Sequence, residues 1–308
     1  MAGSCFICSG TEFGRCTPPY RQCRRCGHET LVVTAAQAYM LNDPLSAADA
    51  RRVSWLDRFQ DTVLERFGGA ARDGLWVDIG TGSGKYLARN RGKFARHCGV
   101  EITPAAVEFP RRELGLEIVT DIGAVGGEIA FATAWHSLEH FPTVALEALL
   151  ARLGASMPAG ARLVVSVPNG ASFQYRLFRT HYAFLDVPAH LQQFTPDSLR
   201  RLLAAHGFQP DETVISWPYN VFGYAQGCLN LVLPGHNYLY HRLKRGMPSR
   251  SRWQDLAHLC LLPLVVPLAA GLSLLDAARP ERQGVLTCCF ARSGPPTSSP
   301  APSAARPS

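Results

Sequence analysis

The middle of the chain alternates between short apolar runs and longer amphipathic segments. The apolar runs have the length of buried strands and lie near residues 75–79, 97–101, 117–119, 129–134 and 161–167. The other segments have helical spacing and lie near residues 84–91, 104–114, 142–153 and 196–206. Strands that alternate with helices in this way predict an α/β fold with a doubly wound parallel sheet.

The pattern changes on both sides of this core. Residues 47–67 carry apolar side chains on one helical face, and Gly68-Gly69 follows as a stop signal. After residue 216, two apolar stretches, 221–240 and 256–275, flank a hinge that carries five basic residues. The uncharged run 259–275 approaches the length of a membrane span but contains two prolines and a glycine.

Composition narrows the function classes. With 308 residues and 47% hydrophobic content, the chain can bury one substantial core with small additions. The formal charge of +7 indicates a solvated basic surface, so nucleic acid is not the expected partner. No leader resembling a signal peptide precedes the first cysteines, which predicts a cytoplasmic location. Residues 293–308 are rich in Pro, Ser and Ala and are expected to be disordered.

Cysteines concentrate at the start of the chain. Two Cys-x-x-Cys pairs can offer four thiolates in a tetrahedron, from Cys5, Cys8, Cys23 and Cys26. Residues 1–33 are therefore predicted to be a zinc ribbon that owes its fold to structural zinc. Cys16 and His28 are spare candidate ligands, and the ribbon either docks a partner or caps the main domain.

The first predicted strand leads into a glycine-rich turn. It ends at Asp78, and the alternating glycines that follow are Gly80, Gly82 and Gly84. Glycines there let the backbone turn tightly and approach a ligand closely. Asp78 can pair with a cationic group, which suits S-adenosylmethionine, and Glu101 at the end of the next strand can accept bonds from ribose hydroxyls.

Several motifs in order then resemble one family. Val-Asp-Ile-Gly-Thr-Gly-Ser-Gly is followed by Gly-Val-Glu-Ile-Thr-Pro, Trp-His-Ser-Leu-Glu-His, Val-Pro-Asn and His-Leu-Gln-Gln-Phe-Thr-Pro. Together they resemble the class I S-adenosylmethionine-dependent methyltransferases, in the branch with a His-x-Leu-Glu-His signature, over roughly residues 70–216. The resemblance implies a Rossmann-like fold whose last strand, 284–291, pairs with a strand near 213–217. It also implies cofactor contacts from Asp121, Ile122 and Trp135, with a plain surface loop as the competing account of Asp121.

The signature also supplies candidate chemistry. On a helical turn, His136, Glu139 and His140 share a face beside the cofactor, and His190 is expected to return over the site. Either a histidine, His140 or His136, acts as base with His190 assisting, or Glu139 and the histidines bind a second divalent metal. Related O-methyltransferases of small RNA and of the ubiquinone pathway use a similar metal set, whose first position is Glu where this chain has His136. Helix capping is the competing account of these residues.

The expected activity is methyl transfer to oxygen on a bulky small-molecule acceptor, lipid-linked or glycan, with nitrogen and carbon left open. Sugar C-methyltransferases also join a zinc module to such a core. A non-catalytic docking module with a cofactor-sensing domain and a nicotinamide oxidoreductase are the rival hypotheses. The apolar insertion is either a lid or a hairpin in peripheral contact with an anionic membrane at its inner face.

The predicted organisation follows from these assignments. It comprises a zinc ribbon at 1–33, a linker and N-terminal helix at 34–70, a Rossmann-like methyltransferase core at 71–218, an apolar helical insertion with a basic hinge at 219–283, a last core strand at 284–292 and a disordered tail at 293–308.

Overall fold

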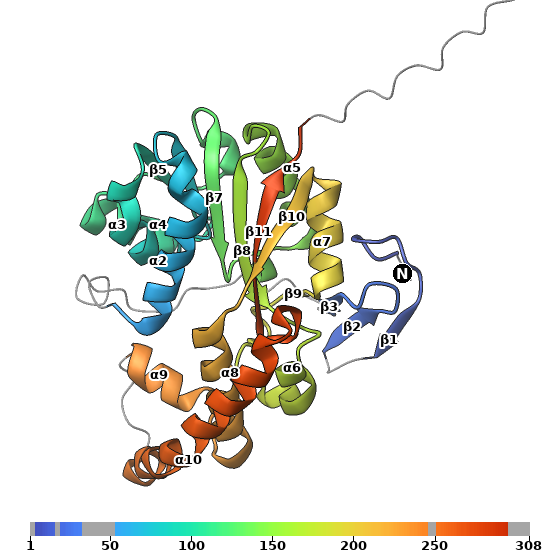
Figure 1. Cartoon of the computed structure of the whole chain (residues 1–308), viewed down its shortest axis with the longest axis vertical. Coiled ribbons are helices and arrows are strands. Elements are labelled where there is room, and N and C mark those ends of the chain that lie inside the picture. The colour runs from blue at the N-terminus through green and yellow to red at the C-terminus, as the bar shows by residue number, and fades with distance from the viewer. Residues whose placement is uncertain (1–3, 16–18, 33–52, 246–250, 295–308) are drawn as a thin grey trace, which may run out of the picture.

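The computed structural model describes residues 4–15, 19–32, 53–245 and 251–294. Its centre is a seven-stranded sheet in the order β10-β11-β8-β7-β4-β5-β6 (Figure 1). The strands are β4 (Leu75–Ile79), β5 (Arg96–Val100), β6 (Ile118–Val119), β7 (Ile129–Trp135), β8 (Arg162–Pro168), β10 (Phe208–Val214) and β11 (Val285–Arg292). Strands β4 to β8 pair in parallel, and β11 runs antiparallel to both its neighbours. This confirms the predicted fold class.

The helices of the core are α2 (Trp55–Gly68), α3 (Lys85–Asn90), α4 (Pro104–Leu114), α5 (Thr143–Ser156), α6 (Phe173–Phe178) and α7 (Pro196–Ala205). Neighbouring residues of β4 enter different hydrophobic clusters on the two faces of the sheet. Val77 packs with apolar residues of α5 and α7, whereas Trp76 packs with those of α2, α3 and α4. The core is therefore covered on both sides, as a doubly wound sheet requires.

Two predicted boundaries are wrong. The helix expected from residue 47 begins at Trp55, because Ser54 and Asp57 form a capping box there. The part of that prediction at 47–52 lies outside the described residues. The strand expected near 213–217 is β10, which pairs with β11 from Phe208 to Val214. The chain leaves the sheet at that point because Pro218 stands in the first turn of the next helix.

The apolar insertion is a helical hairpin that extends from one end of the sheet (Figure 1). It consists of α8 (Trp217–Val232), α9 (Tyr238–Arg245) and α10 (Arg252–Ala277), and α8 packs along α10. Within the described ranges, α10 is the one helix long and apolar enough to cross a membrane by length and composition. Residues 246–250 of the basic hinge lie outside the described residues, as do 33–52 of the linker and 295–308 of the tail.

The cysteine-rich segment folds into a small antiparallel sheet of four strands. Its own strands are β1 (Phe13–Arg15), β2 (Tyr20–Cys23) and β3 (Glu29–Leu31). The fourth strand, β9 (Gln192–Gln193), comes from the segment between β8 and α7 and pairs with β3. The predicted ribbon therefore does not stand apart, because a piece of the core segment completes its sheet.

Candidate active site and metal centre

The glycine turn after β4 contains one open position between two closely packed ones. All three glycines have positive φ, +71° at Gly80, +53° at Gly82 and +72° at Gly84. A Cβ at Gly80 would lie 2.3 Å from Cβ of Ser137, and one at Gly84 would lie 2.6 Å from Cβ of Pro110. A Cβ at Gly82 would meet only the carbonyl oxygen of Gly80, at 3.9 Å. The space over Gly82 is open, and any side chain at this position would fill it. We call this space the cradle, because a ligand can approach the backbone there.

Asp78 is a buried carboxyl at the end of β4. The hydroxyl of Thr133 donates to its Oδ1 at 2.7 Å, and Nε1 of Trp76 donates to that hydroxyl at 3.0 Å. Burial, opposed by the hydrogen bond from Thr133 and aided by the charge of nearby Glu101, raises the pKa of Asp78 to about 7. A carboxyl whose charge is poorly solvated is stabilised by a cationic partner, so Asp78 fits the ammonium group of S-adenosylmethionine.

Glu101 holds the turn from the neighbouring strand. One of its oxygens accepts the N–H of Gly82 at 2.9 Å, and the other accepts the N–H of Thr103 at 2.8 Å. Each carboxylate oxygen retains a further lone pair that can accept a hydroxyl proton. Glu101 therefore both shapes the cradle and fits two ribose hydroxyls.

The other predicted cofactor contacts are divided between surface and core. Asp121 is exposed, and its carboxylate caps a short 3-10 turn by accepting the N–H of Gly123. Ile122 is buried in the core cluster that includes Val77. Trp135 ends β7 on the other face, with its ring 5.8 Å from that of Tyr86. Asp121 therefore has a structural role as the cap of this turn, and its exposed carboxylate is also accessible to a ligand.

The signature His-Ser-Leu-Glu-His is not one helical turn, as the spacing had suggested. His136 lies before the turn with a left-handed φ of +48°, and its N–H donates to the carbonyl of Ser166 at 2.8 Å. Only Leu138–His140 forms a 3-10 helix. Nδ1 of His136 nevertheless lies 3.5 Å from Oε1 of Glu139, so the strained backbone brings the two side chains together.

Glu139, His140 and His190 form a compact donor set. One ligand atom from each lies within 4.8 Å of the others, and the rings of the two histidines are 4.7 Å apart. His136 is not part of this set. The structure therefore places three of the four predicted metal-ligating residues together, with the fourth, His136, beside Glu139.

The electrostatics of this cluster are unusual for buried groups. Burial would raise the pKa of Glu139, but the hydrogen bond from His136 and the charges of the histidines lower it. Burial, followed by repulsion from His140, lowers the pKa of His190 to about 4. Oε2 of Glu139 and Nδ1 of His190 have no hydrogen-bond partner among the described residues. A buried carboxylate and a neutral imidazole with free lone pairs fit a divalent cation.

Aromatic residues missed by the sequence analysis enclose His136. The ring of Tyr219 in α8 lies 5.0 Å from the imidazole, and Phe184 stacks on it at 6.2 Å. Gln60 of α2 donates to the Tyr219 hydroxyl at 3.1 Å. These residues carry no motif, and the only signal at Tyr219 was its place at the start of the apolar insertion.

The four ribbon thiols meet at one point. Their sulfur atoms all lie within 4.8 Å of one another, with Cys5 and Cys26 3.8 Å apart and Cys8 and Cys23 3.5 Å apart. Tetrahedral zinc with ordinary Zn–S bonds requires roughly 3.8 Å between sulfurs. The residues therefore fit structural zinc.

Of the two spare ligands, His28 does not join these four thiols. His28 is buried away from them, with Nε2 2.8 Å from Oε1 of Gln192, and burial lowers its pKa to about 4. Cys16 lies outside the described residues. The ring of His28 instead packs between those of Phe6 and Phe194. The histidine thus joins the ribbon to the core rather than to the metal.

The ribbon contacts the donor set through the segment around His190. The Tyr20 hydroxyl donates to the carbonyl of His190 at 2.9 Å, and the Leu31 N–H donates to the carbonyl of Leu191 at 2.9 Å. The Leu191 N–H in turn donates to the carbonyl of Glu139 at 2.8 Å. The predicted zinc site and the candidate catalytic cluster are therefore joined by a continuous set of backbone contacts.

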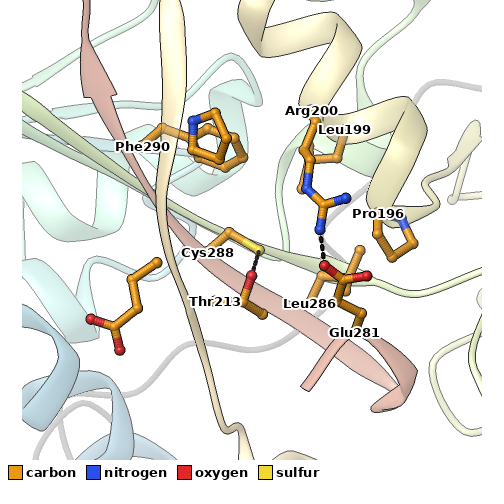
Figure 2. A pocket seen from close by; sticks show the side chains of 10 residues that line it. Pro196, Leu199, Arg200, Thr213, Glu281, Leu286, Cys288 and Phe290 are labelled. Atoms are coloured by element: carbon orange, nitrogen blue, oxygen red, sulfur yellow. Dashed lines mark hydrogen bonds and ion pairs between the residues drawn. The ribbon is translucent and has the colours of Figure 1, made fainter. Parts of the chain in front are cut away.

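A small depression elsewhere on the core does not belong to this site. It lies between α7 and the β10–β11 edge and is lined by Leu199, Leu286 and Phe290, with an Arg200–Glu281 ion pair at its rim (Figure 2). Strands β8 and β7 separate that edge from the glycine turn. Its apolar lining is the seam between helix and sheet, and none of the predicted site residues lines it.

We predict that Gly82→Ala abolishes binding of S-adenosylhomocysteine, the demethylated product of the expected cofactor, while leaving the fold intact. The left-handed backbone costs an alanine roughly 1–2 kcal/mol of stability, and the new methyl group occupies the cradle. Gly115→Ala is the matched control, because Gly115 has φ +62° and open space around its Cβ position. Equal binding by the two variants, measured by calorimetry beside thermal unfolding, would show that the cradle is misplaced.

We also predict that affinity for S-adenosylhomocysteine falls as the pH drops below about 7, because protonated Asp78 must lose its proton before it can pair with an ammonium. The slope approaches about tenfold per pH unit well below that pKa. Asp78→Asn should bind weakly above pH 7 and show no such slope. Calorimetric titrations across that pKa test this, and a slope retained in Asp78→Asn would assign the titrating group elsewhere.

A third prediction concerns the ribbon. Cys26→Ser should remove zinc, increase amide hydrogen exchange at Leu191 and β9, and lower methyl transfer, yet retain S-adenosylhomocysteine binding because other elements build the glycine turn. Cys260→Ser, at an exposed cysteine of α10, is the control. Elemental analysis and exchange measurements decide the matter, and unchanged exchange at Leu191 in a zinc-free variant would refute the coupling.

Comparison with known proteins agrees with this geometry. The family model described as "Methyltransferase domain" matches residues 51–213, which is more than half of the chain. No curated protein sequence matches. Similar solved structures include the [4+2]-cyclase SpnF, with 16% identity over 83% of this chain and 89% of that chain and a TM-score of 0.49.

Two others are named as methyltransferases. A SAM-dependent methyltransferase from Archaeoglobus fulgidus shares 17% identity over 77% of this chain and 94% of that chain, with a TM-score of 0.45. Magnesium protoporphyrin IX methyltransferase from Synechocystis, with bound SAH, shares 17% identity over 53% and 81%, with a TM-score of 0.42. With the family match, the glycine cradle and its two carboxylates in place, the chain belongs to the methyltransferase domain family and is an S-adenosylmethionine-dependent methyltransferase.

Proposed function

We propose that this enzyme methylates a hydroxyl group of a bulky, amphiphilic acceptor, such as a lipid-linked glycan, at the cytoplasmic face of a membrane. The observation that carries the proposal is the buried Glu139 between His136, His140 and His190, two residues after Ser137, which packs on Gly80. A cluster with free nitrogen and oxygen lone pairs beside the cradle is suited to removing a proton from an acceptor.

Methyl transfer to a hydroxyl requires that proton to be removed. The acceptor oxygen forms a bond to the methyl carbon while the carbon–sulfur bond breaks, and its proton passes to a base. Bound S-adenosylmethionine supplies the electrophilic methyl group. His136 is suited to receive the proton, because Glu139 holds its imidazole through Nδ1 and its Nε2 has no hydrogen-bond partner among the described residues.

Glu139, His140 and His190 would hold the divalent metal if one binds. Such a metal would lower the pKa of a coordinated hydroxyl. The chain's own contribution is to orient the donors: the carbonyl of Ala189 lies 3.0 Å from Nδ1 of His140 and fixes the orientation of that imidazole. His136 would then orient the acceptor rather than act as the sole base.

The aromatic surroundings of His136 support an acceptor larger than a metabolite of a few atoms. Tyr219 and Phe184 place apolar surface directly beside the imidazole, and Tyr219 begins the apolar hairpin. An acceptor with a polar reactive end and an apolar remainder would place its polar end at His136 and its apolar part against the aromatic rings and the hairpin. Membership of the methyltransferase family favours this enzyme over the docking-module and oxidoreductase hypotheses.

We predict that Glu139→Gln and His136→Ala each lower methyl transfer by about 10²–10⁴-fold without changing S-adenosylhomocysteine affinity. His206→Ala, at the far end of α7, is the control and should transfer normally. The assay measures transfer of a labelled methyl group to a polyprenyl-phosphate-linked glycan and to the same glycan without lipid. Transfer that survives both substitutions, or that prefers the free glycan, would contradict the proposal.

A metal requirement is tested in the same assay. Chelation followed by gel filtration should reduce transfer, and divalent metal added back should restore it in the native protein but not in His190→Ala. Full activity after chelation would assign proton removal to the histidines alone.

A further inference from the structure

Helix α10 is apolar on nearly all of its surface but packs on the protein along one narrow stripe. The buried residues of this helix recur at helical spacing and are His258, Val265, Ala269, Ser273 and Asp276. The large apolar side chains on the outer side are exposed, and they are Trp253, Leu256, Leu259, Leu264, Val266, Leu268, Leu274 and Leu275. Only 22% of its most apolar window is buried. A face of this length and composition requires a partner that removes it from water.

The acidic residues of α10 do not lie on its outer apolar face. Between Arg252 and Ala277 the helix carries two acidic residues, and both point to the protein. Asp255 accepts from the Tyr238 hydroxyl at 2.6 Å, and Asp276 accepts from the Tyr224 hydroxyl at 2.7 Å. The outer face therefore presents hydrocarbon without interruption by charge.

The topology argues against α10 as a membrane span. Its 26 residues measure roughly 39 Å, enough to cross a hydrocarbon core of about 30 Å. However, α8 follows β10 and α10 precedes β11, and these two strands are hydrogen-bonded neighbours. A crossing α10 would need a return crossing by α8, which is shorter at 16 residues and carries buried Asn220, Gln226 and Asn230.

Basic residues stand at both ends of the helix. Arg252 begins it and is exposed, and Lys244 and Arg245 end α9, the preceding helix in the chain, after Arg242, which pairs with Asp255 at 3.3 Å. Arg279 and Arg282 follow its last turn and are exposed. Trp253, 80% exposed, stands next to Arg252, where an indole favours the boundary between hydrocarbon and headgroups.

We infer that α10 lies in the plane of an anionic membrane leaflet, with its outer apolar face among the acyl chains and the arginines at its two ends among acidic headgroups. An upright hairpin would instead carry Arg252 and Asp255 into hydrocarbon, which is costly. The in-plane orientation keeps every charge at the headgroup level. A second copy of this chain would bring the same basic ends against each other and lacks that complementarity.

Docking in this orientation has a consequence for the site. Helix α8 packs along α10 and begins beside His136, through Tyr219. The membrane surface and the catalytic cluster are therefore joined by one rigid hairpin. The inference stands on the surface of α10 and does not rest on the proposed acceptor, although a lipid-linked acceptor would reach the cluster from that side.

The test uses the full chain and vesicles. Flotation is measured with phosphatidylcholine vesicles with and without phosphatidylglycerol, for the native protein and for the triple variant Leu259→Gln/Leu264→Gln/Leu268→Gln. We expect binding that requires phosphatidylglycerol, falls with salt, and drops about 100-fold in the triple variant because three exposed leucines lose their apolar burial. Val144→Gln, at a valine 79% exposed on α5, is the matched control and should bind normally.

Two further measurements test the orientation of α10 in the membrane and the possibility that a second copy of the chain covers its apolar face. Lipids brominated near the headgroup should quench Trp253 more than lipids brominated at the chain end, judged against a Trp253→Phe variant. Retained S-adenosylhomocysteine binding shows that each variant is folded, independently of any acceptor. Equal flotation of native and triple variant would overturn the inference, as would light scattering that shows a dimer dispersed by the triple variant without vesicle binding.

Discussion

The structure depends most on the segment 189–193, where three parts of the molecule share backbone hydrogen bonds. The carbonyl of Leu191 accepts from the N–H of Leu31 in the ribbon, and the N–H of Leu191 donates to the carbonyl of Glu139 in the candidate donor set. Gln192 and Gln193 complete the ribbon sheet as β9. Because backbone hydrogen bonds are short and directional, the position of His190 is set from both sides at once. The ribbon is thus part of the scaffold that holds the candidate donor set, rather than an ornament at the end of the chain.

Two buried carboxyl groups of the candidate site lie in opposite electrostatic surroundings. Asp78 has a hydroxyl partner and a neighbouring acid, so burial leaves its charged form unfavourable. Glu139 is equally buried, but the surrounding imidazoles favour its charged form. The surroundings of Asp78 therefore favour pairing with a cationic group of a ligand, whereas the charged form of Glu139 is already stabilised by the neighbouring histidines. The glycine turn that follows Asp78 packs on Ser137, two residues before Glu139.

The apolar hairpin also has two sides of different polarity. The inner stripe of α10 is polar where it meets α8, with Asp276 bonded to Tyr224 and Asn220. Its outer face is apolar along the whole of α10. Specificity in such folds resides in the additions rather than in the sheet. Here the addition begins beside His136 and ends at a surface that we infer to be lipid-bound.

The sequence by itself determined the sheet, its order of helices and strands, the glycine cradle and the four thiols, because these follow from local periodicity and short-range spacing. It also suggested the His136, Glu139, His140 and His190 set, but it misjudged the local geometry, since His136 has a left-handed backbone that spacing cannot reveal. Only the tertiary structure showed that β9 joins the ribbon, that Tyr219 and Phe184 enclose His136, and that the two acidic residues of α10 face the protein. Each of these depends on contacts between residues far apart in the chain, and such contacts leave no periodic signal in the sequence.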